Sequence, residues 1–391
     1  MTNVYEKLGV RRIINAAGTV TRLGGSRMSP EVTAAMTEAA SNFVRIDELQ
    51  AAVGRRIAEL TGAEAALVTT GAAAGLTLAA AACLCGERFD RMDQLPDTSA
   101  MPHEIIVPRS QRHGYDHALR AAGATLVDVG VAERTRDPQP WEIEAAIGPN
   151  TVAIAFSVGF SPLELAPVVE VARRHQLPVI VDAAAALPPK DNLWKFTCAG
   201  ADLIVFSGGK GIGGPQSTGI LCGRRALVAS AALQMWDLDF LPELWNPPEW
   251  LIPADLPARG VPNHGIGRGF KVGKEELVGL WTALERFHAR DEIAELARLN
   301  AIVDRLAERL KRIAALRVSR CEEAGRWSRL RLEIIDPVVD VIALLRKLEA
   351  EDPPIYLMPG EAHARVVGID PIGLQPADIE IIARRIEDEL R

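Results

Sequence analysis

The stretch LIVFSGGKGIGGP, residues 203–215, decides how the rest of the chain is interpreted. Its first four residues form an uninterrupted apolar run, which is typical of a strand buried on both faces of a parallel sheet. Glycines surround Lys210 and let other groups approach it closely. A lysine that follows a buried strand is suited to form a Schiff base with a carbonyl compound, whereas the alternative is an ordinary solvated lysine. The strand and the glycines favour the first interpretation.

A second apolar run, residues 178–181, ends at Asp182. The order strand, acid, strand, lysine is the usual plan of a pyridoxal-phosphate site, in which the acid keeps the pyridine nitrogen protonated and the lysine binds the aldehyde carbon. Asp182 could instead cap the helix that follows it. The alanines at 183–186 leave room for a flat ring beside the acid and favour the cofactor role. We therefore predict Lys210 and Asp182 as the catalytic pair.

A run of small residues, TTGAAAG at 69–75, follows one predicted strand and opens a helix. Side chains this small let backbone N–H groups reach an anion, and the helix N-terminus attracts negative charge. The pattern therefore predicts phosphate binding by Gly71, Ala72 and Ala73, with the hydroxyl of Ser207 as a further donor. Tight helix packing without a ligand is the alternative.

The glycines around Lys210 also match the G-x-G-x-x-G pattern of dinucleotide-binding proteins over residues 209–214. The context contradicts that interpretation, because Pro215 and the strand-like residues 218–222 stand where the helix of such a motif should begin. Lys210 is followed by glycine rather than by serine or threonine, so a phosphate-loop nucleotide site is excluded as well.

One histidine is predicted to stack on the cofactor ring. Of the three ring residues His113, Tyr115 and His117, His113 is nearest to the end of the predicted strand at 105–107. Two alternatives remain: a solvated surface position, or a metal site formed with His117 four residues later. A third metal ligand is not evident, and Gly114 weakens a helix here, so we predict no metal.

Recognition of a substrate carboxylate calls for a guanidinium group. Arginines in loop or glycine-rich contexts are the candidates, although a lone arginine more often serves solubility. We predict Arg365 and Arg22 as substrate-binding residues and Arg268 as a cofactor-binding residue, with Arg112 as a further candidate.

Composition narrows the class of protein. The chain has 391 residues, 48% of them hydrophobic, and a formal net charge of −7, which disfavours a nucleic-acid partner. The five cysteines are odd in number and show no metal-ligand spacing, so reduced thiols are expected. No export signal is recognised, and a cytoplasmic location is expected. The charge-free residues 65–86 are alanine-rich and broken at 69–71, which predicts a strand and a buried helix rather than a membrane span.

Short apolar runs alternate with helical stretches from residue 47 onward, which predicts an α/β fold with a mostly parallel sheet covered by helices on both faces. We expect an N-terminal arm at 1–46, a large domain at 47–270 and a smaller α+β domain at 271–391. The proline-rich segment 238–259 is predicted to be a long loop or lid. The end of the chain is predicted to form a final amphipathic helix with Ile379, Ile382, Ile386 and Leu390.

The motifs resemble those of fold type I pyridoxal-phosphate enzymes, and more narrowly the selenocysteine-synthase-like branch that includes the D-glucosaminate-6-phosphate ammonia-lyases. The resemblance extends over nearly the whole chain and rests on residues 14–19, 60–65, 70–75, 181–185, 206–216 and 271–276. It implies a seven-stranded sheet, pyridoxal 5'-phosphate bound through Lys210 with Asp182 at the ring nitrogen, and a homo-oligomer of at least two chains that share active sites. The region around Arg268 and the N-terminal arm would then reach a neighbouring chain.

The resemblance also suggests a reaction. We expect a lyase that catalyses α,β-elimination on a hydroxylated or β-substituted amino acid or an amino sugar acid, and that releases a 2-oxo acid and ammonia. A racemase, epimerase or aldolase on the same cofactor is the alternative. A selenocysteine-synthase-type transferase and a non-catalytic regulator that retains the fold are further alternatives. The acidic charge disfavours a tRNA substrate.

Overall fold

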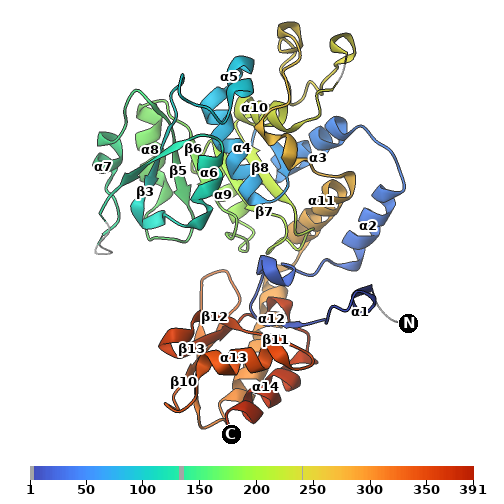
Figure 1. Cartoon of the computed structure of the whole chain (residues 1–391), viewed down its shortest axis with the longest axis vertical. Helices are drawn as coiled ribbons and strands as arrows, with labels where there is room; N and C mark the ends of the chain where they lie inside the picture. Colours follow the sequence, from blue (N-terminus) through green and yellow to red (C-terminus); the bar gives the residue numbers. More distant parts are fainter. Residues whose placement is uncertain (1–3, 132–135, 240) are drawn as a thin grey trace. The chain divides into compact units, whose positions relative to one another are not determined.

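The computed structural model describes residues 4–131, 136–239 and 241–391 (Figure 1). Contacts divide the chain into a large unit, residues 28–288, and a small unit made of residues up to 27 together with residues 289–391. This division differs from the expected boundaries after residues 46 and 270. The strand β1 (Ile14–Asn15) pairs with β11 (Ile355–Tyr356) of the small unit, whereas the helix α11 (Lys274–Ala289) packs into the core of the large unit.

The large unit contains a seven-stranded sheet in the order β2-β8-β7-β6-β5-β3-β4. Only β8 runs antiparallel to its neighbours, so the predicted mostly parallel sheet of seven strands is confirmed. The strands are β2 (Ala65–Thr69), β3 (Glu104–Pro108), β4 (Thr125–Val129), β5 (Thr151–Ser157), β6 (Val179–Asp182), β7 (Leu203–Ser207) and β8 (Gly219–Gly223). Residues of the inner strands are apolar at successive positions because both faces of the sheet are covered.

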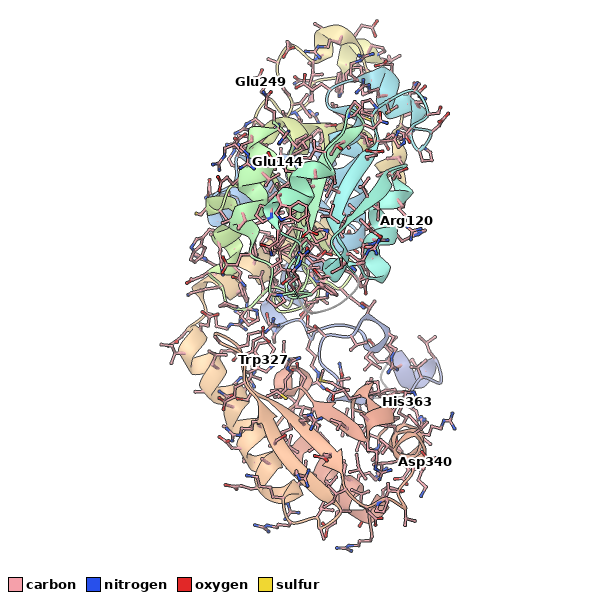
Figure 2. All side chains as sticks on the ribbon, turned by 90° about the vertical axis from the view of Figure 1, so that its left-hand side faces the viewer. Arg120, Glu144, Glu249, Trp327, Asp340 and His363 are labelled. Atoms are coloured by element: carbon pink, nitrogen blue, oxygen red, sulfur yellow. The ribbon has the colours of Figure 1, made fainter. Side chains whose placement is uncertain are left out.

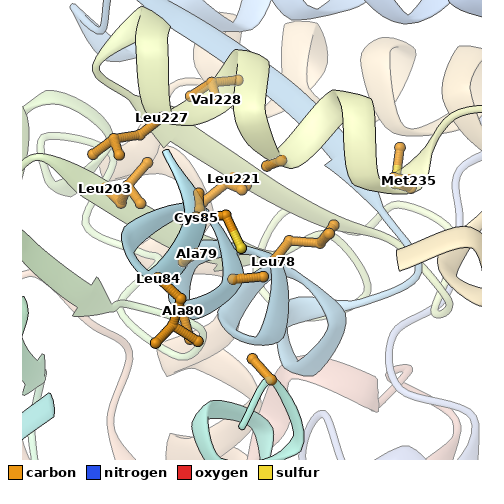
Figure 3. Packing of buried hydrophobic residues seen from close by; sticks show 14 of the residues in the cluster. Leu78, Ala79, Ala80, Leu84, Cys85, Leu203, Leu221, Leu227, Val228 and Met235 are labelled. Atoms are coloured by element: carbon orange, nitrogen blue, oxygen red, sulfur yellow. The ribbon is translucent and has the colours of Figure 1, made fainter. Parts of the chain in front are cut away.

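One face of the sheet packs against α4 (Ala72–Cys85) and α10 (Arg225–Met235), and Figure 3 shows Leu78 and Cys85 of α4 beneath Val228 of α10. The predicted strand and buried helix within residues 65–86 are confirmed. Within the described residues, no helix is long and apolar enough to cross a membrane.

The opposite face is covered mainly by α3 (Ile46–Thr61), α8 (Leu165–Arg174), α9 (Asn192–Cys198) and α11. The remaining helices of this unit are α2 (Pro30–Ala40), α5 (Phe89–Gln94), α6 (His117–Ala121) and α7 (Pro140–Ala145). In the described residues of the segment 238–259, the only helices are the short 3-10 turns Pro242–Leu244 and Pro257–Arg259, which agrees with the predicted loop.

Buried Gln50 protects the edge of the sheet at β2. Its Nε2 donates to the carbonyl of Val68 at 2.9 Å, and its Oε1 accepts from the N–H of Val68 at 3.1 Å. Both backbone groups that an edge strand leaves open at this residue are therefore satisfied by one side chain of α3.

The small unit has a four-stranded antiparallel sheet in the order β12-β13-β10-β9 and the helices α12, α13 and α14, which fits the predicted α+β domain. Asp340, labelled in Figure 2, caps α13 by accepting from the N–H groups of Ile342 and Ala343. The elements are α1 (Val4–Lys7), α12 (Glu292–Leu310), β9 (Leu316–Cys321), β10 (Arg329–Ile334), α13 (Val341–Ala350), β12 (Met358–Glu361), β13 (Val366–Ile369) and α14 (Asp378–Glu389).

Candidate active site

The sheet register brings the predicted site residues to one edge. Asp182 is the last residue of β6 and pairs with Ser157 on β5 and Val205 on β7. One strand further, Gly219 of β8 pairs with both Ser207 of β7 and Thr69 of β2. Because β2, β5, β6 and β7 run parallel, the residues that follow them emerge at the same edge, where ligands of such sheets bind.

Asp182 is a buried carboxylate, with 13% of its side chain exposed. Burial raises its pKa, and the hydrogen bond that Oδ1 accepts from the N–H of Ala184 at 3.0 Å partly opposes this rise. The Oδ2 atom lies 3.8 Å from Nε2 of His113. A cationic ring nitrogen beside Asp182 would stabilise the ionised carboxylate, so the site fits a protonated pyridine.

Lys210 lies three residues beyond β7, where burial lowers the pKa of its amine and the negative charge of Asp182 opposes the effect more weakly. The amine is therefore neutral at a lower pH than an exposed lysine, as a nucleophile or base requires. The flanking glycines allow close backbone packing. A Cβ on Gly209 would lie 2.4 Å from Cα of Gln216, and one on Gly211 would lie 2.2 Å from the carbonyl oxygen of Leu187.

The start of α4 has the properties of an anion site. Gly71 precedes the helix with φ 88°, a conformation that L side chains rarely adopt, and a Cβ there would meet open space. The first turn carries no acidic residue and no side-chain cap, so its N–H groups remain available. Gly219 packs against this turn, since its Cβ would lie 2.4 Å from the carbonyl carbon of Gly71. These features fit a phosphate group.

The structure brings His113 next to Asp182. Its Nδ1 accepts from the N–H of Tyr115 at 3.2 Å, and its Nε2 lies 3.0 Å from Oγ of Ser157. The ring of Phe160 stacks on the imidazole with a centroid distance of 4.2 Å and an interplanar angle of 17°. Among the described residues, no cluster of three His, Cys, Asp or Glu side chains could hold a metal ion.

Two of the predicted arginines belong to the large unit. Arg268 donates to Asp237 at 2.9 Å and lines a cavity of about 840 Å³ together with Arg45 and Lys271. Arg112 bridges two carboxylates, Asp116 and Asp128, and so fixes the loop that carries His113. Its guanidinium is used within the protein.

The other two arginines belong to the small unit. Arg365 donates to the backbone carbonyls of Ile334 and Val339, each at 3.1 Å, and to that of Asp336. These bonds give it a structural role. Exposed Arg22 lies over the ring of Tyr356, 5.4 Å from the centroid.

Sequence reasoning missed Ser157, Gln111 and Phe160, which contact His113 directly or through one another. Ser157 carried a usable signal, because a polar residue directly follows the apolar run 152–156 in the same way that Asp182 follows its run. Gln111 ends a short 3-10 helix and Phe160 lies in a loop, and neither stretch shows a pattern in the sequence.

Comparisons with known proteins identify relatives over the whole chain. Residues 26–208 match the model of the DegT/DnrJ/EryC1/StrS aminotransferase family. The chain is 30% identical to a D-glucosaminate-6-phosphate ammonia lyase of Salmonella typhimurium, over 99% of this chain and 97% of the relative. It is 32% identical to a 5'-C-glycyluridine monooxygenase-decarboxylase of a Streptomyces species, over 100% and 92%. An L-seryl-tRNA(Sec) selenium transferase of Solidesulfovibrio magneticus is 28% identical over 81% of this chain and 65% of the relative.

Solved structures agree with the sequence comparisons. A structure of D-glucosaminate-6-phosphate ammonia-lyase superposes with a TM-score of 0.80 at 29% identity and covers 100% of this chain and 99% of that one. A serine palmitoyltransferase with bound PLP, at 14% identity and a TM-score of 0.59, shares the fold over 97% of this chain and 87% of its own. The protein is an enzyme whose cofactor is pyridoxal 5'-phosphate. The chain belongs to the selenocysteine-synthase-like branch of the fold type I pyridoxal-phosphate enzymes, the branch that includes D-glucosaminate-6-phosphate ammonia-lyase.

Proposed function

We propose that this enzyme is an ammonia-lyase that catalyses α,β-elimination on an amino sugar acid or a related hydroxylated amino acid and releases a 2-oxo acid and ammonia. The observation that carries the proposal is the likeness to D-glucosaminate-6-phosphate ammonia lyase over 99% of the chain. The buried pair of Lys210 and Asp182 at the edge of the sheet supports it, because elimination needs both a base and an electron-withdrawing ring.

In this proposal each residue of the site has a defined task. Lys210 binds the cofactor aldehyde, Asp182 holds the ring nitrogen protonated, and His113 covers the ring. The N–H groups of Ala72 and Ala73 and the hydroxyl of Ser207 bind the phosphate, whereas the N–H of Gly71 donates to the carbonyl of Thr69 at 2.8 Å and Gly71 contributes the turn. When bound, the cofactor supplies an electron-poor ring that stabilises negative charge on the substrate α-carbon.

Lys210 also serves as the base. Its amine, whose pKa burial lowers, takes the α-proton onto Nζ. The bond from the β-carbon to its hydroxyl oxygen then breaks, and the hydroxyl leaves as water with a proton from the site. The released 2-enamine tautomerises to an imine, and one water hydrolyses it to the 2-oxo acid and ammonia. The overall reaction therefore consumes no oxidant or reductant.

Arg22 is the proposed partner of the substrate carboxylate. No hydrogen bond or ion pair of its guanidinium to another described residue is present, and its face rests on Tyr356. A guanidinium held in this way keeps its donors for a carboxylate. Arg365 is less suited, because three backbone carbonyls already occupy it.

We further propose a homo-oligomer of at least two copies, in which Arg268 contributes to the cofactor site of a neighbouring copy. Arg268 is held by Asp237 in a cavity whose described lining contains neither Lys210 nor Asp182. We therefore assign the proposed cofactor contact of Arg268 to a second chain.

The experiment that tests the function starts from protein purified with pyridoxal phosphate. The visible absorbance of a lysine Schiff base should be present, and borohydride should attach the cofactor to the peptide that contains Lys210. A panel of D- and L-hydroxy amino acids and amino sugar acids, free and phosphorylated, is then scored for ammonia and 2-oxo acid in equal amounts. A coloured protein that releases neither product from any of them contradicts the lyase assignment.

A second candidate function is oxygen-dependent decarboxylation of a glycyl nucleoside. The full-length likeness to the 5'-C-glycyluridine monooxygenase-decarboxylase, at 32% identity, favours it. The two functions differ in what they consume. Oxygen uptake and release of carbon dioxide with 5'-C-glycyluridine, without ammonia-yielding elimination on the panel, would select this candidate.

A further inference from the structure

The contacts around His113 define the position of its ring proton. Backbone N–H groups can only donate, so the bond from Tyr115 N at 3.2 Å requires a lone pair on Nδ1. In the neutral imidazole the proton therefore resides on Nε2. This Nε2–H points to Oγ of Ser157, 3.0 Å away, with Oδ2 of Asp182 at 3.8 Å.

Ser157 is itself held by a buried amide. The N–H of Ser157 donates to Oε1 of Gln111 at 2.8 Å, which orients the amide and leaves Nε2 of Gln111 facing Oγ of Ser161 at 3.3 Å. Gln111 is fully buried and Ser157 is 8% exposed, so these groups have little access to competing water. The backbone of β5 and the loop that carries His113 are thereby tied together.

Phe160 limits the ring plane. It stacks on one face of the imidazole at 4.2 Å and is itself 52% exposed. One face of the imidazole, its Nδ1 and its Nε2 each have a defined partner, and the ring of Tyr115 lies in a T-shaped arrangement at a centroid distance of 5.9 Å. A ring fixed in tautomer and plane presents the same surface to a flat ligand at every encounter.

We propose that Ser157, anchored by Gln111, is a positioning residue that holds His113 as its Nε2–H tautomer with a fixed ring plane beside Asp182. The inference deepens the proposed function, on which the role of His113 as the stacking residue rests. Ser157 acts through His113. Gln111 contacts Ser157, Ser157 contacts His113, and His113 lies beside Asp182. Removal of its hydroxyl leaves Nε2–H without its acceptor.

The test uses the full-length protein with ¹⁵N-labelled histidine, with and without pyridoxal phosphate. In the wild type, His113 should show a protonated Nε2 whose proton exchanges slowly with water. Ser157→Ala should speed this exchange and broaden or shift the ring signals, and Ser157→Thr should restore them, because it keeps the hydroxyl. Binding of pyridoxal phosphate should weaken roughly 2- to 10-fold in Ser157→Ala, as expected for one lost hydrogen bond.

His103 provides a control within the same spectrum. Its Nδ1 lies 2.8 Å from the carbonyl oxygen of Met101, which can only accept, so neutral His103 has the opposite tautomer. Its signals should not respond to changes at residue 157. If Ser157→Ala does not fold, Ser157→Cys replaces it, since a thiol preserves packing and is only a weak acceptor.

An His113 signal that is the same in wild type and in the folded Ser157 variants would overturn the inference. So would a wild-type His113 protonated on Nδ1 alone. Both results are independent of turnover. A chain that binds no pyridoxal phosphate would count against the proposed function instead, while the spectra without cofactor would still decide the role of Ser157.

Discussion

Replacing Asp182 with asparagine separates two roles that a carboxylate at the end of a strand can have. The structure shows Oδ1 accepting from the N–H of Ala184 at 3.0 Å, and the amide oxygen of an asparagine can accept the same bond. Asp182→Asn thus preserves the shape of the side chain and its hydrogen bond to Ala184 in the turn after β6. What is lost is the negative charge that burial already makes costly to maintain.

The charge determines the size of the effect. A carboxylate and a ring cation at a hydrogen-bond distance of about 2.8 Å attract each other by about 6 kcal/mol at an effective dielectric constant of about 20. Desolvation of the buried carboxylate offsets part of this attraction. We therefore expect a loss of about 3 kcal/mol of transition-state stabilisation, or about 10²-fold in kcat.

The assay compares kcat and KM of wild type and Asp182→Asn with a substrate identified in the panel, together with cofactor affinity and the visible spectrum. We expect the fall mainly in kcat, with the protein folded and the cofactor still bound. If kcat stays within about threefold of the wild type, less than about 0.7 kcal/mol is lost, and Asp182 serves only to hold the turn at Ala184 rather than to pair with the ring nitrogen.

Four further outcomes are expected. Lys210→Ala should abolish turnover yet still bind some cofactor, and full activity in this variant would remove Lys210 from the mechanism. Because the pKa of Lys210 is lowered in the folded protein, the unfolded chain binds more protons than the folded chain between that pKa and the ordinary lysine value of 10.5. The unfolding free energy of the cofactor-free protein should therefore rise with pH in this window. The same rise in Lys210→Ala would contradict the assignment. Gly211→Ala should destabilise the protein by about 1–3 kcal/mol in urea unfolding because its Cβ would lie 2.2 Å from the carbonyl oxygen of Leu187, whereas Gly148→Ala, at a glycine with open space, is the matched control; equal effects would refute the packing argument. Arg365→Met should lower the unfolding free energy by about 1–2 kcal/mol and leave KM unchanged, and a large rise in KM with normal stability would restore a substrate-binding role.

Much of the fold was predictable because its signals are local. Mostly apolar runs of three to five residues indicated buried strands, and six of them correspond to β2 through β7. The limits of the units were not predictable in the same way. They depend on the pairing of Ile14 with Ile355, which are far apart in the chain, and on the packing of Leu277 and Leu284 of α11 on the large sheet.

The site residues also differ in how far they could be predicted from sequence. Asp182 ends strand β6 and Lys210 lies three residues beyond strand β7, so their positions could be inferred from short stretches of sequence. Arg268 and Arg365 could not be assigned from sequence, since their partners, Asp237 and the carbonyls near Ile334, lie about thirty residues away. A guanidinium used within the fold and one kept for a ligand have the same letter in the sequence.

By itself the sequence determined the α/β class and the cofactor and gave the proposed catalytic pair, because strand periodicity and the residue types at strand ends are encoded within a few neighbouring positions. Only the tertiary structure decided how His113 is held, since its partner Ser157 is 44 residues away and the anchoring Gln111 is 46 residues from Ser157. Sheet register and loop packing bring these residues together in space. Hydrogen bonds between such groups exist only once the chain has folded.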